Sequence, residues 1–391
     1  MKLGVLLSRV PYPLEKGDKL RAFHQIKELS KNHEIYLCAI NTNQLHPKAI
    51  EKLTPYCKEI KIIKLSKWSI LLNLIYSLLF SGLPLQIAYF YNRRAKSKVW
   101  KFFNQNKIEH LYCQLIRISE YVKSYPAPKT LDYMDALSRG MERRIEKAPF
   151  YLKPFVKIEG KRLKKYEHFI FSEFDNKTII SEQDRELIIH ADNNKIEIIP
   201  NGVDLDFFKK PKSDKSIDIL FTGNMSYPPN VLTAEFICKE ILPLIHTKNK
   251  EIKVVIAGAN PSARVQRLAS DSVEITGWVD DIRSYYSKAK VFLAPMQIGT
   301  GLQNKLLEAM AMKVPCITSE LANNALGATN AENILIGKNA EEFAQLCLQL
   351  LSNRENANEI ADRGYAFVSQ NYNWESCTKK LEKLFFKSKE N

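Results

Sequence analysis

The chain has 391 residues, 45% of them hydrophobic and 10% aromatic, which excludes a disordered protein and allows two domains of ordinary size. Lys and Arg outnumber Asp and Glu by 58 to 43, for a formal net charge of +15, and this excess implies an anionic partner or surface. The seven cysteines are scattered without a CxxC pair. They predict reduced thiols in a cytoplasmic protein, with neither a disulfide framework nor a zinc site.

The first half of the chain alternates apolar strands with helical segments. Residues 3–8 (LGVLLS) predict a strand, and the Pro- and Gly-containing loop VPYPLEKGDK follows it. Apolar residues then recur at helical spacing over about 20–32. Further strands are expected at 35–40, 60–65, 108–113, 130–134 and 177–181. This alternation predicts an α/β fold with a doubly wound parallel sheet.

Residues 68–92 form a stretch of 25 residues without a formal charge. The stretch is long enough to span a bilayer, but Gly82 and Pro84 divide it, several polar residues dilute it, and basic residues flank it. Three interpretations stay open from the sequence: contact with a membrane interface, ordinary core helices, or a true span.

A basic region lies between Arg139 and Lys165 and contains ten Lys and Arg residues. No zinc-finger, helix-turn-helix or RNP signature accompanies it, so no nucleic-acid partner is expected. An anionic membrane surface on the cytoplasmic side fits the charge better, because lysine clusters are attracted to it. A merely solvated basic helix is the alternative.

The second half repeats the strand–helix alternation. Strands are expected at 217–223, 253–258, 273–277, 291–296, 316–319 and 333–336. Gly223, Gly258 and Gly277 each stand at the end of a strand, where a glycine lets a ligand approach the backbone closely.

The segment GTGLQNKLLEAMAMKVPCITS, residues 299–319, is the most informative of the second half. It reads as a loop, a helix and a strand, and an apolar strand precedes it. In a parallel sheet, ligands bind at the carboxyl ends of the strands, and a helix N-terminus there attracts anions. The loop, with Gly301 and Asn304, and the ammonium of Lys305 therefore suit a diphosphate, while Glu308 suits ribose hydroxyls. The alternative is an ordinary crossover helix with a surface lysine.

Together these features resemble the family 4 glycosyltransferases of the GT-B fold. The resemblance rests on the two doubly wound halves, the junction IPNGVD (199–204), the strand–TG–loop segments and LLEAMAMKVPCITS (306–319). Near the start, PYPLEKGDKLR (11–21) is similar to the exopolysaccharide-associated sugar transferases.

The resemblance implies two domains facing across a cleft and retaining transfer of a sugar from a nucleotide-diphosphate donor. The acceptor-side domain would be residues 1–197 with a returning helix at 372–391, and the donor-binding domain residues 198–371. The implied partners are a nucleotide sugar, a lipid-linked or glycan acceptor and an anionic membrane surface, with a location on the inner face of the cell membrane. No metal and no cofactor are expected, because helix N-termini, cations and backbone amides neutralise the leaving diphosphate.

The resemblance also assigns roles to individual residues. In the second domain, Lys305 binds the diphosphate and Glu308 the ribose, Gly223 and Asn224 face the phosphates, and the backbone at Trp278 and Val279 meets the base. In the first domain, Gly17 approaches the donor, while Asp18 and Arg21 hold donor or acceptor groups. The donor-binding set is therefore Gly17, Asp18, Gly223, Asn224, Val279, Gly301, Asn304, Lys305 and Glu308.

The chain departs from many relatives at three places. Thr300 stands where they have a first glutamate, no Arg or Lys follows Gly223, and Gln114 replaces a first-domain histidine. The acceptor-side base is therefore unsettled, with Asp132 and Asp135 as catalytic candidates beside Arg21. The alternative for both carboxylates is a helix N-cap ahead of Ser138.

Two other functions stay open. A nucleotide-sugar 2-epimerase has the same two-domain architecture, and a degenerate enzyme that only binds membranes would keep the basic surface. Retention of Lys305 and Glu308 argues against the degenerate enzyme.

Overall fold

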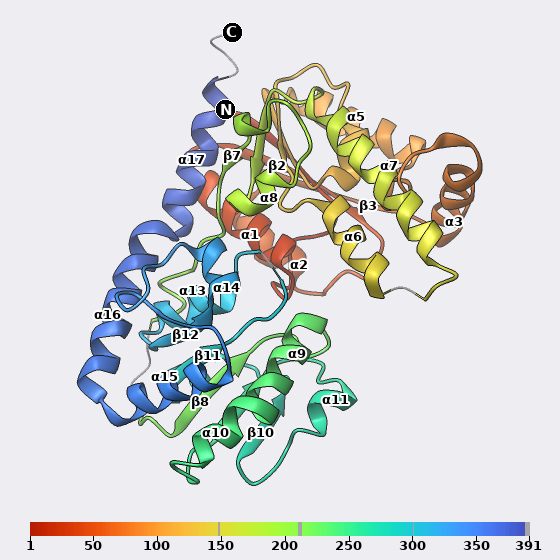
Figure 1. The fold of residues 1–391 in the computed structure, drawn as a ribbon. Coiled ribbons are helices and arrows are strands. Elements are labelled where there is room, and N and C mark those ends of the chain that lie inside the picture. The colour runs from red at the N-terminus through yellow and green to blue at the C-terminus, as the bar shows by residue number, and fades with distance from the viewer. Residues whose placement is uncertain (148, 210–212, 300, 388–391) are drawn as a thin grey trace. The chain divides into compact units, whose positions relative to one another are not determined.

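The computed structural model describes residues 1–147, 149–209, 213–299 and 301–387, with backbone only at 142–144, 146–147 and 387 (Figure 1). The chain divides into two compact units: Met1–Pro200 with Trp374–Asn391, and Asn201–Asn373. The divisions predicted from the sequence lie at 197/198 and 371/372. Each unit contains one parallel sheet covered by helices, which confirms the predicted α/β class.

The first unit is built on a seven-stranded parallel sheet in the order β3-β2-β1-β4-β5-β6-β7. Its central strands are buried on both faces, as a sheet covered by helices on each side requires. The strands are β1 Lys2–Leu7, β2 Glu34–Asn41, β3 Glu59–Lys64, β4 His110–Gln114, β5 Lys129–Asp132, β6 Asn176–Ile179 and β7 Glu197–Ile198.

The helix predicted at 20–32 begins three residues earlier, so that Gly17 and Asp18 lie in its first turn and not in the preceding loop. The last helix, α17, packs on α1 and contributes Leu381, Leu384 and Phe385 to the core beneath it (Figure 1). The helices of this unit are α1 Gly17–Leu29, α2 Ala49–Leu53, α3 Lys67–Tyr76, α4 Leu85–Phe90, α5 Arg93–Asn106, α6 Leu137–Lys147, α7 Lys153–Phe171, α8 Glu182–Glu186 and α17 Trp374–Lys387.

The second unit has a six-stranded parallel sheet in the order β10-β9-β8-β11-β12-β13. Its strands are β8 Ile217–Thr222, β9 Val254–Ala257, β10 Val273–Gly277, β11 Ala289–Ala294, β12 Cys316–Ser319 and β13 Leu335–Gly337. Its helices are α9 Pro228–Phe236, α10 Leu242–His246, α11 Ala263–Gln266, α12 Arg283–Lys288, α13 Asn304–Ala311, α14 Glu320–Leu326, α15 Ala340–Ser352 and α16 Arg354–Asn371.

Both sheets change winding direction beside their first strand. In the first unit β1 lies between β2 and β4, and in the second β8 lies between β9 and β11. The loops that leave β1 and β4, or β8 and β11, diverge to opposite sides and open a crevice at the carboxyl edge of the sheet. Strand order therefore selects one place in each unit for ligand binding.

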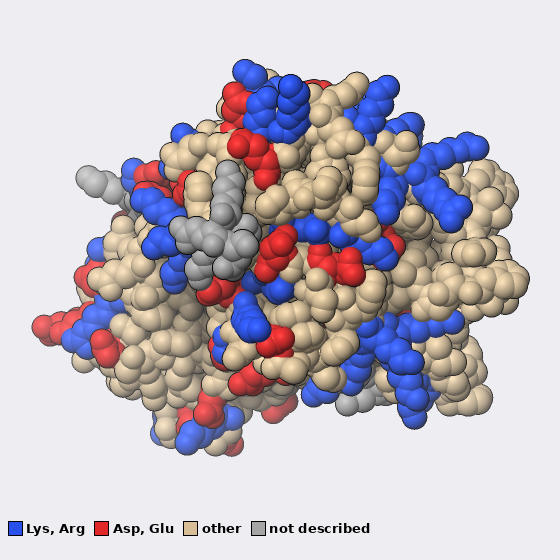
Figure 2. Space-filling model, turned by 90° about the horizontal axis from the view of Figure 1, so that it is seen from above, with Lys and Arg blue, Asp and Glu red and all other residues tan. Residues whose placement is uncertain are grey.

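The uncharged stretch folds into three short elements. Helix α3 continues into a π-helical turn, η2 (Ser77–Ser81), and α4 follows after Gly82 and Pro84. No helix in the described part of the chain is long and apolar enough to cross a membrane. In Figure 2 the right-hand side, where α3 lies in Figure 1, is uncharged over a broad area and is bordered by Lys and Arg.

Candidate functional site

The second unit brings two predicted segments together at its winding change. The loop after β8 carries Gly223 and Asn224, and the loop after β11 leads into α13, which begins at Asn304. Helix α13 starts without a side-chain cap, and uncapped N–H groups at a helix start are suited to bind an anion.

Lys305 extends from the first turn of α13 toward the β8 loop. Its ammonium donates a hydrogen bond to Asn230 Oδ1 at 2.5 Å and lies 4.5 Å from the centre of the Phe221 ring. The side chain is half-buried, yet the surrounding protein removes much of its hydration, and this desolvation lowers its pKa to about 7 although Glu308 opposes the change. An arriving diphosphate would restore the charge of this lysine.

Glu308 lies one turn further along α13 and is held by a buried tyrosine. Tyr286 donates a hydrogen bond to Glu308 Oε2 at 2.9 Å, and its oxygen lies 2.8 Å from Thr222 Oγ1. Desolvation raises the pKa of Glu308 to about 7, against the effects of Tyr286 and Lys305. The hydrogen bond from Tyr286 fixes one carboxylate oxygen of Glu308. The side chain is half-buried, and its other oxygen could accept a hydrogen bond from a ligand.

Two glycines let the strand ends approach each other here. A Cβ on Gly258 would lie 1.9 Å from the carbonyl oxygen of Gly223, and its φ of +142° disfavours a side chain. A Cβ on Gly223 would lie 2.6 Å from Asn230 Nδ2 and 3.1 Å from Lys305 Nζ. The side chains of Asn230 and Lys305 can therefore lie above Gly223 only because this residue has no side chain.

The other residues predicted to bind the donor lie on neighbouring loops or at the start of α13. Val279 follows β10 and is half-buried beside the exposed Trp278. Gly301 accepts a hydrogen bond from Gln303 at 2.8 Å. Asn304 accepts one from Asn201, of the IPNGVD junction, at 3.2 Å. Thr300 lies outside the described residues, so the structure does not test the missing carboxylate.

Sequence reasoning missed Asn230 and Tyr286, which position the two central side chains. Asn230 lies in the first turns of α9 and also donates to the carbonyl of Asn224 at 2.9 Å. Many relatives are expected to have an Arg and a Lys after the glycine that Gly223 matches. In this chain the side-chain amide of Asn230 follows instead, and it accepts a hydrogen bond from Lys305. The missing Arg and Lys after Gly223 were the sequence signal that this loop differs from that of many relatives.

In the first unit, Gly17 and Asp18 lie at the β1/β4 crevice. Gly17 is exposed, and a Cβ there would meet no atom within 4 Å. Asp18 forms an ion pair with Arg9 at 2.7 Å. Gln114, at the end of β4, donates to the carbonyl of Asp18 at 3.1 Å and so anchors the start of α1.

Arg21 and Asp132 require a correction, because both side chains are fully buried, with 0% exposed. Arg21 Nε donates to Asp132 Oδ2 at 2.6 Å, and the Tyr112 hydroxyl donates to the same oxygen at 2.7 Å. Burial disfavours the charge of Arg21, but the Asp132 carboxylate still raises its pKa. The pair ties α1 to the sheet and is not placed to touch an acceptor in this structure.

Asp135 is exposed, in contrast to Asp132. Although one side meets solvent, the surrounding protein removes part of its hydration and raises its pKa to about 6, with Arg117 opposing and Asp184 reinforcing the change. Neither aspartate caps the helix ahead of Ser138, because the Ser138 N–H donates to Glu167 at 3.0 Å. Asp135 is therefore the catalytic candidate whose carboxylate remains available to a substrate.

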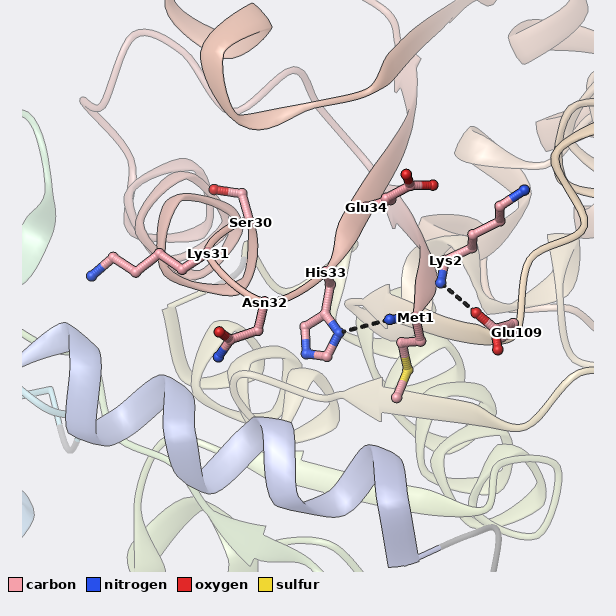
Figure 3. A pocket seen from close by; sticks show the side chains of 8 residues that line it. All are labelled: Met1, Lys2, Ser30, Lys31, Asn32, His33, Glu34 and Glu109. Carbon is pink, nitrogen blue, oxygen red and sulfur yellow. Dashed lines mark hydrogen bonds between the residues drawn. The ribbon is translucent and has the colours of Figure 1, made fainter.

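A shallow surface pocket lies elsewhere in the first unit (Figure 3). It is lined by Met1, Lys2, Ser30, Lys31, Asn32, His33, Glu34 and Glu109, and the N-terminal amine lies 3.5 Å from His33 Nδ1. These residues stand at the amino ends of β1 and β2. The pocket is therefore on the edge of the sheet opposite to the crevice, and none of the predicted site residues lines it.

Comparison with known proteins agrees with this architecture. Residues 216–353 match the family of glycosyl transferases group 1. A curated Klebsiella pneumoniae sequence, described as an uncharacterized protein in the cps region, is 22% identical and covers 99% of both chains. Among solved structures, the Anabaena protein HepE in complex with UDP and glucose aligns with a TM-score of 0.68 at 13% identity, over 98% of each chain. Sucrose-phosphate synthase from Thermosynechococcus elongatus aligns with a TM-score of 0.67 at 14% identity, over 99% of each.

The two sheets and these alignments show that the chain has the GT-B fold, as the resemblance predicted. Its segment 216–353, which contains the loop after β8 and the helix of Lys305 and Glu308, matches the group 1 glycosyl transferases.

Proposed function

We propose that the protein is a retaining glycosyltransferase that transfers a sugar from a nucleotide-diphosphate donor in the synthesis of a cell-surface polysaccharide. The observation that carries this proposal is the arrangement on α13: a desolvated lysine at an uncapped helix start, with a tyrosine-held glutamate one turn later. Lys305 would neutralise the diphosphate, and Glu308, one turn further along the same helix, would accept hydrogen bonds from the ribose hydroxyls.

We further propose a lipid-linked or glycan acceptor and a location on the cytoplasmic face of the membrane. The relative in the cps region supports the polysaccharide pathway, and the net charge of +15 supports an anionic surface. HepE has been solved with UDP and with UDP-glucose, which makes uridine nucleotides the first donors to test. No metal or other cofactor enters the proposal.

The nucleotide is tested by thermal-shift measurements with UDP, GDP, ADP and their sugars. A ligand at a hundred times its dissociation constant stabilises the protein by about 2.7 kcal/mol, so the correct nucleotide gives a clear rise in Tm. Incubation of the stabilising nucleotide sugar without acceptor then separates the two enzyme classes. A new nucleotide-sugar epimer would identify a 2-epimerase and overturn the transferase proposal.

Substitution Glu308→Ala is expected to weaken binding of UDP-glucose by roughly 10- to 100-fold, because a charged acceptor for the ribose hydroxyls is lost. Isothermal titration calorimetry measures the change, and an unaltered Tm of the free protein shows that the fold persists. Glu320→Ala, on the neighbouring helix α14, is the matched control. Unchanged affinity in Glu308→Ala would remove the ribose assignment.

Donor affinity is expected to fall as pH rises above about 7. The diphosphate raises the pKa of Lys305 from its lowered value of about 7, so the complex holds a proton that the free protein loses. Affinity then falls by up to about tenfold per pH unit.

Because Glu308 titrates in the same range, the measurement uses Glu308→Gln. Calorimetry in two buffers of different ionisation enthalpy detects the proton uptake, and its absence would show that Lys305 does not contact the diphosphate.

A further inference from the structure

Helix α3 and the following turn η2 have most of their apolar side chains on the outside, while Ile70 and Leu74 of α3 pack in or against the core. Trp68, Leu71, Leu72, Ile75, Tyr76 and Leu79 recur at helical spacing, and all six are exposed. Their exposed fractions include 76% for Trp68 and 65% for Leu72. An ordinary surface helix shows water its polar face, whereas α3 exposes more apolar side chains than it buries.

One polar residue of α3 and one of η2 point inward. Asn73 donates a hydrogen bond to the carbonyl of Tyr91, and the fully buried Ser77 donates to that of Leu83. These bonds fix the rotation of α3, because turning its leucines inward would break both. The exposed apolar face is thus a property of the folded unit, and large exposed apolar patches mark interaction surfaces.

Helix α7 extends this surface. Arg162 donates to the carbonyls of Ser77 and Leu78 in η2 at 3.4 and 3.5 Å. Ile158 and Phe155, one and two turns earlier on the same face of α7, are exposed. The preceding turn adds Phe150, which is 84% exposed. The apolar residues of α7 therefore lie beside η2 within the same unit.

A stripe of lysines borders the apolar residues. Lys153, Lys157, Lys161 and Lys165 repeat every four residues along α7 and are all exposed. No ion pair involves any of these four within the described part of the chain. Unpaired cations beside exposed leucines and aromatic rings are the composition of elements that lie in a membrane interface, where lysines meet anionic headgroups.

We propose that α3, η2 and the start of α7 form a docking face for an anionic lipid bilayer. The apolar side chains enter the interface, Trp68 and Tyr76 lie at headgroup depth, and the lysine stripe contacts anionic headgroups. A bilayer accounts for both the apolar side chains and the lysine stripe of this face, because it offers a continuous apolar layer together with negatively charged headgroups. The inference rests on the proposed membrane location and names the elements responsible for it.

The test is flotation of the full chain with vesicles of phosphatidylcholine alone or mixed equally with phosphatidylglycerol. We expect binding to the anionic vesicles and weaker binding in high salt. Leu72→Asp with Leu79→Asp should reduce binding roughly tenfold or more, since both leucines are exposed and their loss leaves the core intact. Lys157→Glu with Lys161→Glu should reduce it by a similar factor, at roughly fivefold or more per lysine.

Two matched controls keep the test specific. Ile189→Asp changes another exposed apolar residue of the first unit, and Lys248→Glu with Lys250→Glu reverses two exposed charges of the second. Both should bind vesicles like the unaltered protein. Equal binding by all variants, or no binding by the unaltered protein, would overturn the docking face.

Sedimentation velocity tests the other occupants. If the unaltered protein self-associates, binds no vesicles and becomes monomeric in Leu72→Asp with Leu79→Asp, the face covers a second copy and the proposal is wrong. A UDP-glucose thermal shift is measured on every variant. Absent vesicle binding by the unaltered protein with intact donor binding contradicts only the docking face, whereas vesicle binding without donor binding contradicts only the proposed donor site.

Discussion

Replacing Lys305 with methionine is expected to lower kcat/KM for sugar transfer by about 100- to 1000-fold, the loss typical of removing one preorganised electrostatic group. Methionine keeps most of the length and apolar stem of lysine but cannot donate to Asn230 or neutralise a leaving diphosphate. Because the lysine is desolvated, with its pKa lowered to about 7, the substitution removes an unfavourable burial, and the free protein should be no less stable.

The measurement is steady-state kinetics with the nucleotide sugar selected by thermal shift, together with the Tm of each variant. Lys338→Met, at an exposed lysine of the same unit, is the control and should leave kcat/KM unchanged. A second comparison separates position from charge: Asn230→Leu keeps the lysine but removes its hydrogen bond, so its loss should be smaller. Full activity in Lys305→Met would show that the diphosphate is held elsewhere.

Asp132→Ala is expected to destabilise the first unit by about 3–5 kcal/mol, because it leaves the guanidinium of Arg21 buried without its carboxylate. The loss arises from an uncompensated charge and not from a missing catalytic group. Urea unfolding followed by tryptophan fluorescence measures it, since Trp68, Trp100 and Trp374 all lie in the first unit. Asp135→Ala, at an exposed carboxylate three residues later, should have little effect on stability.

A compensating variant distinguishes structure from catalysis. Arg21→Met with Asp132→Leu replaces the buried pair with apolar side chains of similar size, and such replacements are often neutral or stabilising. We expect it to recover most of the stability and the transfer activity. A stable but inactive double variant would instead show that Arg21 or Asp132 acts in the reaction, and the structural interpretation would be wrong.

The fold was largely predictable because its signals are local. Most strands of the two sheets are short apolar runs ended by Gly, Pro or a polar residue, and nearly all predicted strands lie within two residues of their expected positions. The start of α1 was misplaced because Gly17 follows a loop rich in proline and polar residues, which resembles a turn. Its helical conformation depends on the anchoring of Asp18 by Gln114, 96 residues away.

The candidate site was predictable where its residues lie on one helix. Spacing places Lys305 and Glu308 on one helix face, and the resemblance assigns their roles, whereas Asn230 is 75 residues from its lysine and Tyr286 is 22 residues from its glutamate. The same limit explains Asp132. The sequence places it correctly at the carboxyl end of a strand, but its burial depends on Arg21, 111 residues distant. Long-range pairing decides whether a polar residue binds a ligand or holds the fold.

Helix α17 has a consequence for the order in which the chain folds during synthesis. The second unit is one uninterrupted segment, so it can complete its core as soon as residue 373 has left the ribosome. The first unit begins the chain, yet Leu381, Leu384 and Phe385 belong to the core beneath α1. Its strands must therefore wait, with part of their apolar face uncovered, until α17 arrives. Of the two units, the one whose strands are translated earlier finishes folding later.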